Sequence, residues 1–520
     1  MSVYPTSFTI EMYISVILTD GSGNILTDEN GYILTALGWA DVTDDVIAPS
    51  CVWKRGNSGR SITDRVADIG TLSFVLNNSE FNTETTAGYY SPDNLNANSG
   101  FGLDTKVRIT LVENSVTHQE FQGKITSISP EFGIYGEQTV RVTCEDWMAN
   151  AYRDKVLGIT VQTNKRDDEL LTTLINLASI APLDTDFSVG DDTYTYSLHD
   201  ENSQTSTLAR VFQKIAMSGF GRIYLTGYET LVYRSRSELL LSGTPDMTFA
   251  DNMKDLRVTR KKNQRVKEVQ VTTYPAELDS SSVVLWEAQR EVSLAAGESK
   301  TFNISFRDPN GRATRVAALS IVTPVADTDY KFSSTPGSGN DLNASLGITV
   351  TLKADVATVT IINNHGSTTG YLWLHQQRGI GVYLYEPITA TGETGQADGE
   401  TLNIDMIYQD DEDVGEDIKD LVTYWYVLDQ SDVESITFVA NYSQAFMTAA
   451  FLPPGSLVTI QETQTGIDSN FFINGTQKRW LSPYVLEVTW SLIPANQLSG
   501  VCRLDVVGLA ELDDTAILGA

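Results

Sequence analysis

The sequence contains four histidines, His118, His199, His365 and His375, the side chains best suited to metal binding or general acid–base chemistry. No two of them have the spacing of zinc ligands on a helix, and no HExxH sequence occurs. Histidines at the surface or on a strand face are the simpler interpretation. The sequence therefore predicts no metal site and no cofactor.

Motifs for nucleophilic catalysis and phosphate binding are also missing from the sequence. It has no GxSxG elbow and no P-loop. The tight glycine pair Gly219 and Gly221 follows a predicted helix instead of preceding one, which is typical of a helix end and turn. Carboxylates are abundant, but nothing marks two of them as a glycosidase pair. We predict no catalytic residues and a protein that is not an enzyme.

Two charged runs stand out. The acidic run comprises Asp410, Asp411, Glu412, Asp413, Glu416 and Asp417. It fits the first turn of a helix over 410–429, because negative charge complements the helix dipole there, and a metal site is the minority interpretation. The basic run comprises Lys254, Arg257, Arg260, Lys261, Lys262, Arg265 and Lys267. Two interpretations of it stay equally open: a contact with an acidic neighbour, such as another copy of the chain, or a solvated strand face.

Composition limits the function further. The 520 residues allow three or four domains, and a net charge of −31 excludes nucleic-acid binding by the general field of the protein. The three cysteines, Cys51, Cys144 and Cys502, form no CxxC pair and are expected to be buried small hydrophobes in a reducing compartment. The first residues lack a signal peptide, and no apolar run could span a bilayer, so we expect synthesis in a cytoplasm and no membrane segment.

The elements that would position these side chains are mostly strands. Period-two runs such as 71–76 and 139–143 predict a β-barrel or sandwich over about the first 150 residues. Helical spacing appears at 168–180 and 206–218, followed by a strand pair at 222–226 and 230–234, which together predict a small α+β domain. Strand-rich residues from 286 to 404 suit one β-sandwich. A short internal repeat at 20–36 predicts a polar hairpin. It does not predict a calcium loop, because the last ligand position holds no acidic residue.

Several strings resemble, in order, the tail hub or tail-tip minor proteins of siphophages. They are GWADVTDDV at 38–46, WKRG at 53–56, ADIGTLSFVLNN at 67–78, YSP at 90–92, GLDTKVRI at 102–109, FQGKI at 121–125, VTCED at 142–146, GRIYL at 221–225, ETLVY at 229–233, RVKEVQV at 265–271, GYLWL at 370–374 and TAILG at 515–519. Asn77 replaces the usual Asp of the family, its Pro-Gly is missing at 104–105, and the final motif has one extra residue. The resemblance rests on the order and spacing of these strings across nearly the whole chain.

This resemblance implies a mainly β fold with a small α+β domain, two tail-tube-like β-barrel domains and an inserted β-sandwich. The expected domains are a first barrel at 1–152, an α+β domain at 153–245, a second barrel at 246–285 plus 405–520, and the sandwich at 286–404. It also implies a virion protein at the distal end of the phage tail, a homotrimer whose six barrels match a hexameric tube. Expected partners are the tail tube and distal tail proteins, a tail fibre or receptor-binding protein, and DNA only as passing cargo. We further hypothesise an acidic lumen, through which DNA slides without sticking.

Three alternatives remain. The sandwich could bind a receptor or carbohydrate, with Tyr371, Trp373, Tyr383 and Tyr385 stacking on sugars, although alternating aromatic residues more often pack a sheet face. The chain could be a cell-wall hydrolase of the tail, which the missing motifs argue against. It could also be a hexameric distal tail protein, which its four-domain length argues against.

Overall fold

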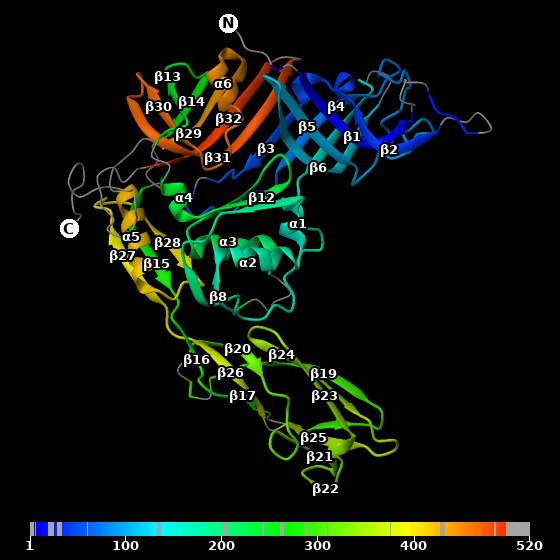
Figure 1. The fold of residues 1–520 in the computed structure, drawn as a ribbon, viewed down its shortest axis with the longest axis vertical. Helices are drawn as coiled ribbons and strands as arrows, with labels where there is room; N and C mark the ends of the chain where they lie inside the picture. Colours follow the sequence, from blue (N-terminus) through cyan, green and yellow to red (C-terminus); the bar gives the residue numbers. More distant parts are fainter. Residues whose placement is uncertain are drawn as a thin grey trace.

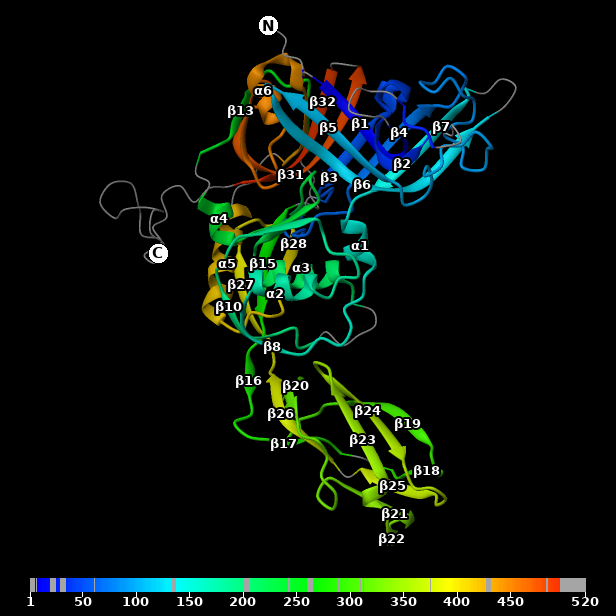
Figure 2. The same ribbon diagram turned by 45° about the vertical axis from the view of Figure 1, so that its right-hand side comes forward.

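The fold is that of a computed structural model of the chain. It describes residues 5, 7–18, 25–28, 34–59, 61–132, 137–200, 206–241, 244–259, 265–287, 290–308, 310–311, 313–374, 376–426, 432–482 and 485–495. These residues are mainly in β-strands, as predicted. A large sheet crosses one end of the molecule, a compact α+β domain lies beneath it, and a β-rich arm projects away from both (Figures 1 and 2).

The first half of the large sheet, called lobe 1, comes from the N-terminal part of the chain. Its strands are β1 (Ser7–Ile17), β2 (Thr35–Asp41), β3 (Val52–Gly56), β4 (Thr71–Asn77), β5 (Lys106–Glu113), β6 (Val116–Glu131) and β7 (Thr139–Glu145). They lie in the order β3-β4-β7-β6-β5-β1-β2. Alternation of buried and exposed residues along β5 places Val107, Ile109 and Leu111 in the core, which is the pattern of a sheet with one solvated face.

The second half, called lobe 2, comes mostly from the C-terminal part. Its elements are β13 (Met247–Ala250), β14 (Asp255–Thr259), β29 (Asp432–Val439), α6 (Gln444–Ala449), β30 (Leu457–Glu462), β31 (Ile467–Ser482) and β32 (Val485–Pro494). The order β14-β29-β32-β31 continues into lobe 1, because β31 pairs antiparallel with β3. One hydrophobic core then extends across both lobes.

The two lobes are therefore not two separate closed barrels. The sequence predicted barrels, but the described pairings form one open sheet of 13 strands, and they close no barrel. The β3–β31 ladder, in which Val52 faces Arg479 and Lys54 faces Gln477, joins the two lobes into this sheet. It uses the second half of β31, while the first half pairs with β30.

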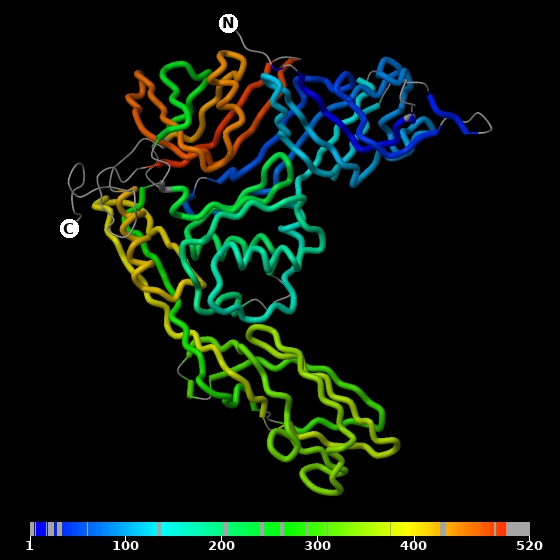
Figure 3. Tube along the Cα trace, viewed as in Figure 1, coloured from blue at the N-terminus to red at the C-terminus, as the bar shows by residue number. Residues whose placement is uncertain are grey.

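The α+β domain lies beneath the large sheet, close to the junction of the two lobes (Figure 3). Its elements are α1 (Met148–Arg153), β8 (Gln162–Arg166), α2 (Asp167–Ile175), β9 (Asp184–Phe187), β10 (Thr193–Ser197), α3 (Leu208–Ser218), β11 (Arg222–Leu225), β12 (Thr230–Arg234) and α4 (Arg236–Leu241). Both predicted helices and the predicted strand pair are confirmed. The apolar stripe of α3 is buried, Thr207 caps its first turn by accepting a hydrogen bond from the Arg210 amide, and Gly219 follows its last residue.

A three-stranded sheet connects this body to the arm. It consists of β27 (Ile388–Glu393), β15 (Val266–Thr273) and β28 (Glu400–Met406), with β15 antiparallel to β27 and parallel to β28. Helix α5 (Glu412–Tyr426) is the third predicted helix, and it buries Ile418, Leu421 and Val422. Before its first residue, the Asp411 carboxylate accepts the Asp413 amide proton, so this part of the acidic run caps the helix, as predicted.

The arm is a sandwich of short sheets around its own core. Its strands are β16 (Ala276–Leu278), β17 (Val283–Glu287), β18 (Val292–Leu294), β19 (Ser299–Ser305), β20 (Arg315–Ile321), β21 (Tyr330–Thr335), β22 (Ser338–Asp341), β23 (Leu346–Leu352), β24 (Val356–Asn363), β25 (Gly370–Leu374) and β26 (Gln376–Leu384). In the part of the chain that the structure describes, no helix is long and apolar enough to cross a membrane.

The expected domain ranges do not coincide with these sheets. Residues 266–273, expected in the second barrel, pair with 388–393 and 400–406, of which 388–393 and 400–404 were expected in the sandwich. The strand at 283–287, which crosses the expected boundary between residues 285 and 286, belongs to the arm. Most of the predicted hairpin at 20–36 lies outside the described residues.

Candidate assembly surfaces

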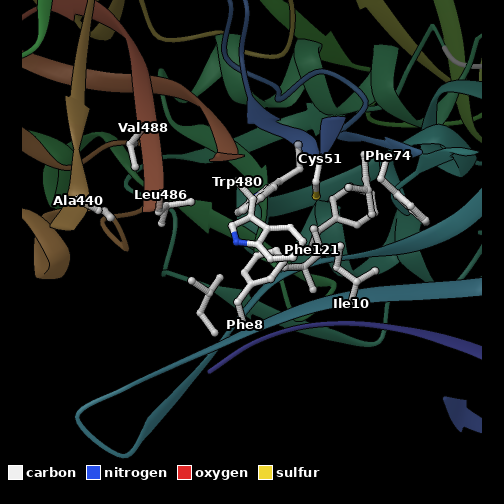
Figure 4. Close-up of a cluster of buried hydrophobic side chains, with 14 of the residues drawn as sticks. Phe8, Ile10, Cys51, Phe74, Phe121, Ala440, Trp480, Leu486 and Val488 are labelled. Atoms are coloured by element: carbon white, nitrogen blue, oxygen red, sulfur yellow. The ribbon is translucent and has the colours of Figure 1, made fainter. Parts of the chain in front are cut away.

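The seam between the lobes is built from large side chains of both. Trp480 of β31 stacks on Phe8 of lobe 1 with ring centroids 4.2 Å apart. Figure 4 shows these two rings beside Cys51, Phe74 and Phe121. Since all of these side chains are buried, the seam is an internal core and not a flexible joint.

A buried ionic cluster lies in the same seam. Glu120 of β6 pairs with Lys478 of β31 and, at 3.3 Å, with Arg55 of β3, and it also accepts the Trp53 indole N–H at 3.4 Å. Burial alone would raise the pKa of Glu120, but Lys478 and Arg55 lower it below its usual range. Burial lowers the pKa of Lys478 to about 8. The cluster therefore joins three strands of the two lobes as a charged pair at neutral pH.

The two cysteines of the described chain are free and buried, as predicted, and Cys502 lies outside the described residues. Burial raises the pKa of the Cys51 thiol, and also that of the Cys144 thiol. The thiolate is the reactive form of cysteine. These two thiols should therefore be unreactive for two reasons: reagents cannot reach them, and they stay protonated.

We expect a Cys502→Ser chain to show no fast reaction with Ellman's reagent in the native state. Both remaining thiols should react once denaturant is added. Rapid labelling of Cys51 or Cys144 in the native chain would contradict the packing of the seam.

The large sheet has free edge strands in both lobes. In the described part of the chain, β2 has a neighbouring strand only on its β1 side, β14 only on its β29 side and β13 only on its β30 side. Leu37 of β2 is 58% exposed. Such strands present unpaired backbone N–H and C=O groups, which are a template for pairing with another chain.

Part of the predicted basic run lies at the β14 end. Lys254 pairs with Glu487, and Arg257 pairs with Glu434 at 2.7 Å, so both are anchored within lobe 2 while most of the Arg257 side chain stays exposed. Lys267 is exposed on β15, and Arg265 precedes that strand. Arg260, Lys261 and Lys262 lie outside the described residues. The proposed contact with an acidic neighbour stays a prediction.

One row of side chains across lobe 1 does not carry the acidity that the lumen hypothesis expects. One cross-strand row runs from Lys54 through Thr71 and Glu145 to Lys124 and Lys106. The only carboxylate in it, Glu145, is paired with Arg153. If this face lined a channel, the channel would be hydroxyl-rich and weakly cationic there, so the acidic-lumen hypothesis needs carboxylates from other segments.

The four aromatic residues expected to contact glycans do not form one platform. Tyr383 of β26 is 5% exposed and belongs to the arm core, and the Tyr385 hydroxyl donates to Glu277. Tyr371 and Trp373 lie on the outward side of β25, which belongs to a different sheet from β26. The pairing of these strands separates the residues that sequence proximity had grouped. Glycan binding by the arm stays a prediction.

A cavity of about 170 Å³ lies where the arm meets the α+β domain, lined by His199, Asp200, Ser305, Phe306, Arg315, Val316, Asp355 and Leu384. Lys214 pairs with Asp200 at 2.6 Å, and Arg315 of the arm approaches Asp200 at 3.8 Å. Burial lowers the pKa of His199 to about 4, so its imidazole is neutral at pH 7. Polar and charged side chains of the arm and of the α+β domain therefore meet at this contact.

The other histidines have structural environments. His118 stacks on Phe451 of lobe 2 with centroids 3.7 Å apart, and His365 Nδ1 accepts the Thr368 amide proton at 3.1 Å. His375 lies outside the described residues. His199 is buried. Among the described residues, no group of three or more His, Cys, Asp or Glu side chains is arranged to hold a metal ion.

Sequence reasoning missed the buried ionic cluster of the seam. A signal did exist, because Lys478 lies two residues before Trp480 in a strand and therefore shares its face. Nothing in the sequence indicated that Glu120, more than 350 residues away, would be its partner.

No protein-family model and no curated protein sequence matches this chain. Solved structures do resemble it. The 43 kDa tail protein of prophage MuSo2 from Shewanella oneidensis is 10% identical, with 94% of this chain and 98% of that chain covered and a TM-score of 0.44. A tail protein from Neisseria meningitidis MC58 is 9% identical, with 93% and 96% covered and a TM-score of 0.45. Prophage tail protein gp18 from Listeria monocytogenes EGD-e is 9% identical, with 95% and 96% covered and a TM-score of 0.38.

Proposed function

We propose that the chain is a structural protein of a bacteriophage tail tip, and that three copies form a hub ring which closes or extends the tail tube. The observation that carries this proposal is the two-lobed sheet with free edge strands in both lobes. A ring protein needs a curved sheet, free edges for its neighbours and no catalytic centre. The proposal accordingly gives the chain no enzymatic role.

The two lobes share a construction, which supports a ring with six similar positions. Each contains one strand of 16 residues, β6 in lobe 1 and β31 in lobe 2. The first half of β6 pairs with β5 and its second half with β7, while β31 pairs with β30 through its first half and with β3 through its second. Three chains with two lobes each would face a sixfold tube with six related units.

Ring closure would use the free edges. Within one chain, lobe 2 meets lobe 1 through β31 and β3; between chains, the β14 end of one copy would meet the β2 end of the next. Such a head-to-tail contact closes a ring when the rotation between copies divides a full turn. The exposed basic side chains at the β14 end and the overall negative charge of the chain favour this pairing.

The arm would connect the ring to the rest of the tail tip. It projects away from the large sheet, so it can reach a tail fibre or receptor-binding protein without disturbing the ring (Figure 2). DNA would pass as cargo during ejection.

Leu37→Lys is expected to weaken self-association at least tenfold without unfolding the chain. The side chain is exposed on the outer strand, and charge on an edge strand opposes pairing. Leu177→Lys, at a similarly exposed position in the α+β domain, is the matched control. Sedimentation of both variants measures the effect. Equal association of Leu37→Lys and the wild type would exclude β2 as a contact.

A further inference from the structure

Two arginines are buried where the lobes, the α+β domain and α5 come together. Arg65 belongs to the connection between β3 and β4, and its carbonyl accepts the Ile223 amide proton of β11 at 2.8 Å. Arg222 is the first residue of β11. Arg65 is 5% exposed and Arg222 is 4% exposed.

Each guanidinium has one hydrogen bond to a backbone carbonyl. Arg65 Nη1 donates to Phe220 O at 3.3 Å, and the guanidinium lies over the Phe220 ring, 3.5 Å from its centroid. Arg222 Nη1 donates to Ile473 O of β31 at 3.1 Å. Arg65 Nε and Nη2 and Arg222 Nε are buried and have no acceptor in the structure.

The unoccupied atoms of Arg65 form one particular edge of the guanidinium. Elsewhere in this chain the same Nε–Nη2 edge holds a carboxylate: Arg108 binds Glu11, Arg166 binds Asp168, and Arg378 binds Asp329, with distances from 2.7 to 3.1 Å. This edge matches the two oxygens of a carboxylate, phosphate or sulfate. In Arg65 it has the geometry of an oxyanion receptor whose anion comes from outside the described chain.

Among the described residues, no carboxylate takes this position. Asp64 is close enough to raise the pKa of Arg222, but its carboxylate accepts the Ser61 amide proton, and no ion pair joins it to either arginine in the described residues. Arg236, which also lowers the pKa of Arg65, is already paired with Asp192. Burial lowers the pKa of Arg65, and Arg222 lowers it further, so two like charges face each other.

A buried guanidinium without a counter-charge is strongly unfavourable, because removal from water costs several kcal/mol per ion. Phe220 compensates only in part, through its ring face. We propose that Arg65 and Arg222 together hold a small oxyanion, phosphate or sulfate in charge and shape, which fixes the junction of the lobes and the α+β domain. This site is independent of the hub ring and exists in the single chain.

Thermal unfolding of the intact chain in phosphate, sulfate, acetate or chloride at matched ionic strength tests the site. A tetrahedral oxyanion should raise the midpoint saturably, by about 2 °C or more, because a ligand of the native state stabilises it by mass action. Chloride should not. A saturable rise in acetate would indicate a general carboxylate site, whereas no rise in acetate would indicate a phosphate or sulfate site. Native mass spectrometry of the same samples identifies the bound anion by its mass.

Arg65→Met removes the charge, keeps an apolar side chain of similar length, and should lose the saturable shift. Arg378→Met is the matched control, since the Nε–Nη2 edge of that arginine is already occupied by Asp329, and it should keep the shift. If Arg65→Met does not fold, Arg222→Met serves instead. The proposal is overturned if the wild type shows no saturable shift and no bound anion, or if the shift survives in both the Arg65 and Arg222 variants.

Discussion

Glu120→Ala is expected to destabilise the lobes by about 3–5 kcal/mol, the usual cost of removing one partner of a buried ion pair. The substitution leaves Lys478 buried without its counter-charge and removes the acceptor of Arg55 and of the Trp53 indole. Because the cluster spans β3, β6 and β31, both lobes should loosen together. Calorimetry of the intact chain measures the change in the transition that unfolds the lobes.

Two further variants show whether charge is the cause. Glu120→Leu combined with Lys478→Met should recover most of the loss, because a buried pair can be replaced by apolar side chains of similar volume. Glu11→Ala breaks a partly exposed pair with Arg108 and should cost less than about 1 kcal/mol. If Glu120→Ala costs no more than Glu11→Ala, the seam is not held by this cluster.

Asp167→Asn is expected to remove a loss of stability that the wild type shows between about pH 4 and pH 7. Asp167 is fully buried and accepts hydrogen bonds from Tyr194 at 2.5 Å and Tyr233 at 2.7 Å. Burial raises its pKa from 3.8 to about 7, although the two tyrosines lower it in part. The unfolded chain therefore releases this proton near pH 4 while the folded chain keeps it to pH 7, so stability falls as pH rises through this window.

The size of the effect follows from the shift, which is worth roughly 4 kcal/mol at about 1.4 kcal/mol per pKa unit. At pH 8 the asparagine variant should be more stable than the wild type by up to this amount, and at pH 4 the two should be similar. Unfolding midpoints measured from pH 4 to pH 8 give the difference.

Asp168→Asn is the matched control: the pKa of Asp168 is lowered with the help of Arg166, so this variant should gain no stability at pH 8. Parallel pH profiles of the wild type and Asp167→Asn would refute the account.

The elements of this fold were largely predictable, because local patterns determine them. Helix α3 follows from the apolar spacing of Leu208, Val211, Phe212 and Ile215, and its first turn is capped by Thr207. The strands β4 and β7 follow from period-two alternation. None of these assignments depends on a distant partner.

The pairing of elements was not predictable in the same way. The β3–β31 ladder joins segments more than 400 residues apart, and it unites the two lobes, which were expected as separate barrels, in one sheet. The parallel pairing of β15 with β28 likewise moves residues 400–404 out of the expected sandwich. Alternation shows which face of a strand is buried, but it does not show which strand lies beside it.

Candidate sites depended on such pairings as well. Tyr383 and Trp373 look equivalent in the sequence, yet β26 turns the first into the arm core and β25 leaves the second exposed. Arg65 and Glu120 are ordinary charged residues in the sequence, and only the packing of distant segments buries them. The resemblance to tail hub proteins rested on short motifs in a fixed order. Such motifs indicate the order of the strands along the chain better than they indicate which strands contact each other.

The mass and symmetry of the purified particle test the central proposal most directly. Light scattering of the intact chain, checked by negative-stain images, should give three times the 57.1 kDa chain mass and a threefold particle with a hole or plug at its centre. A sixfold particle would point to a distal tail protein. A particle that stays a single chain at every concentration, even when tail-tube protein is added, would contradict the hub ring.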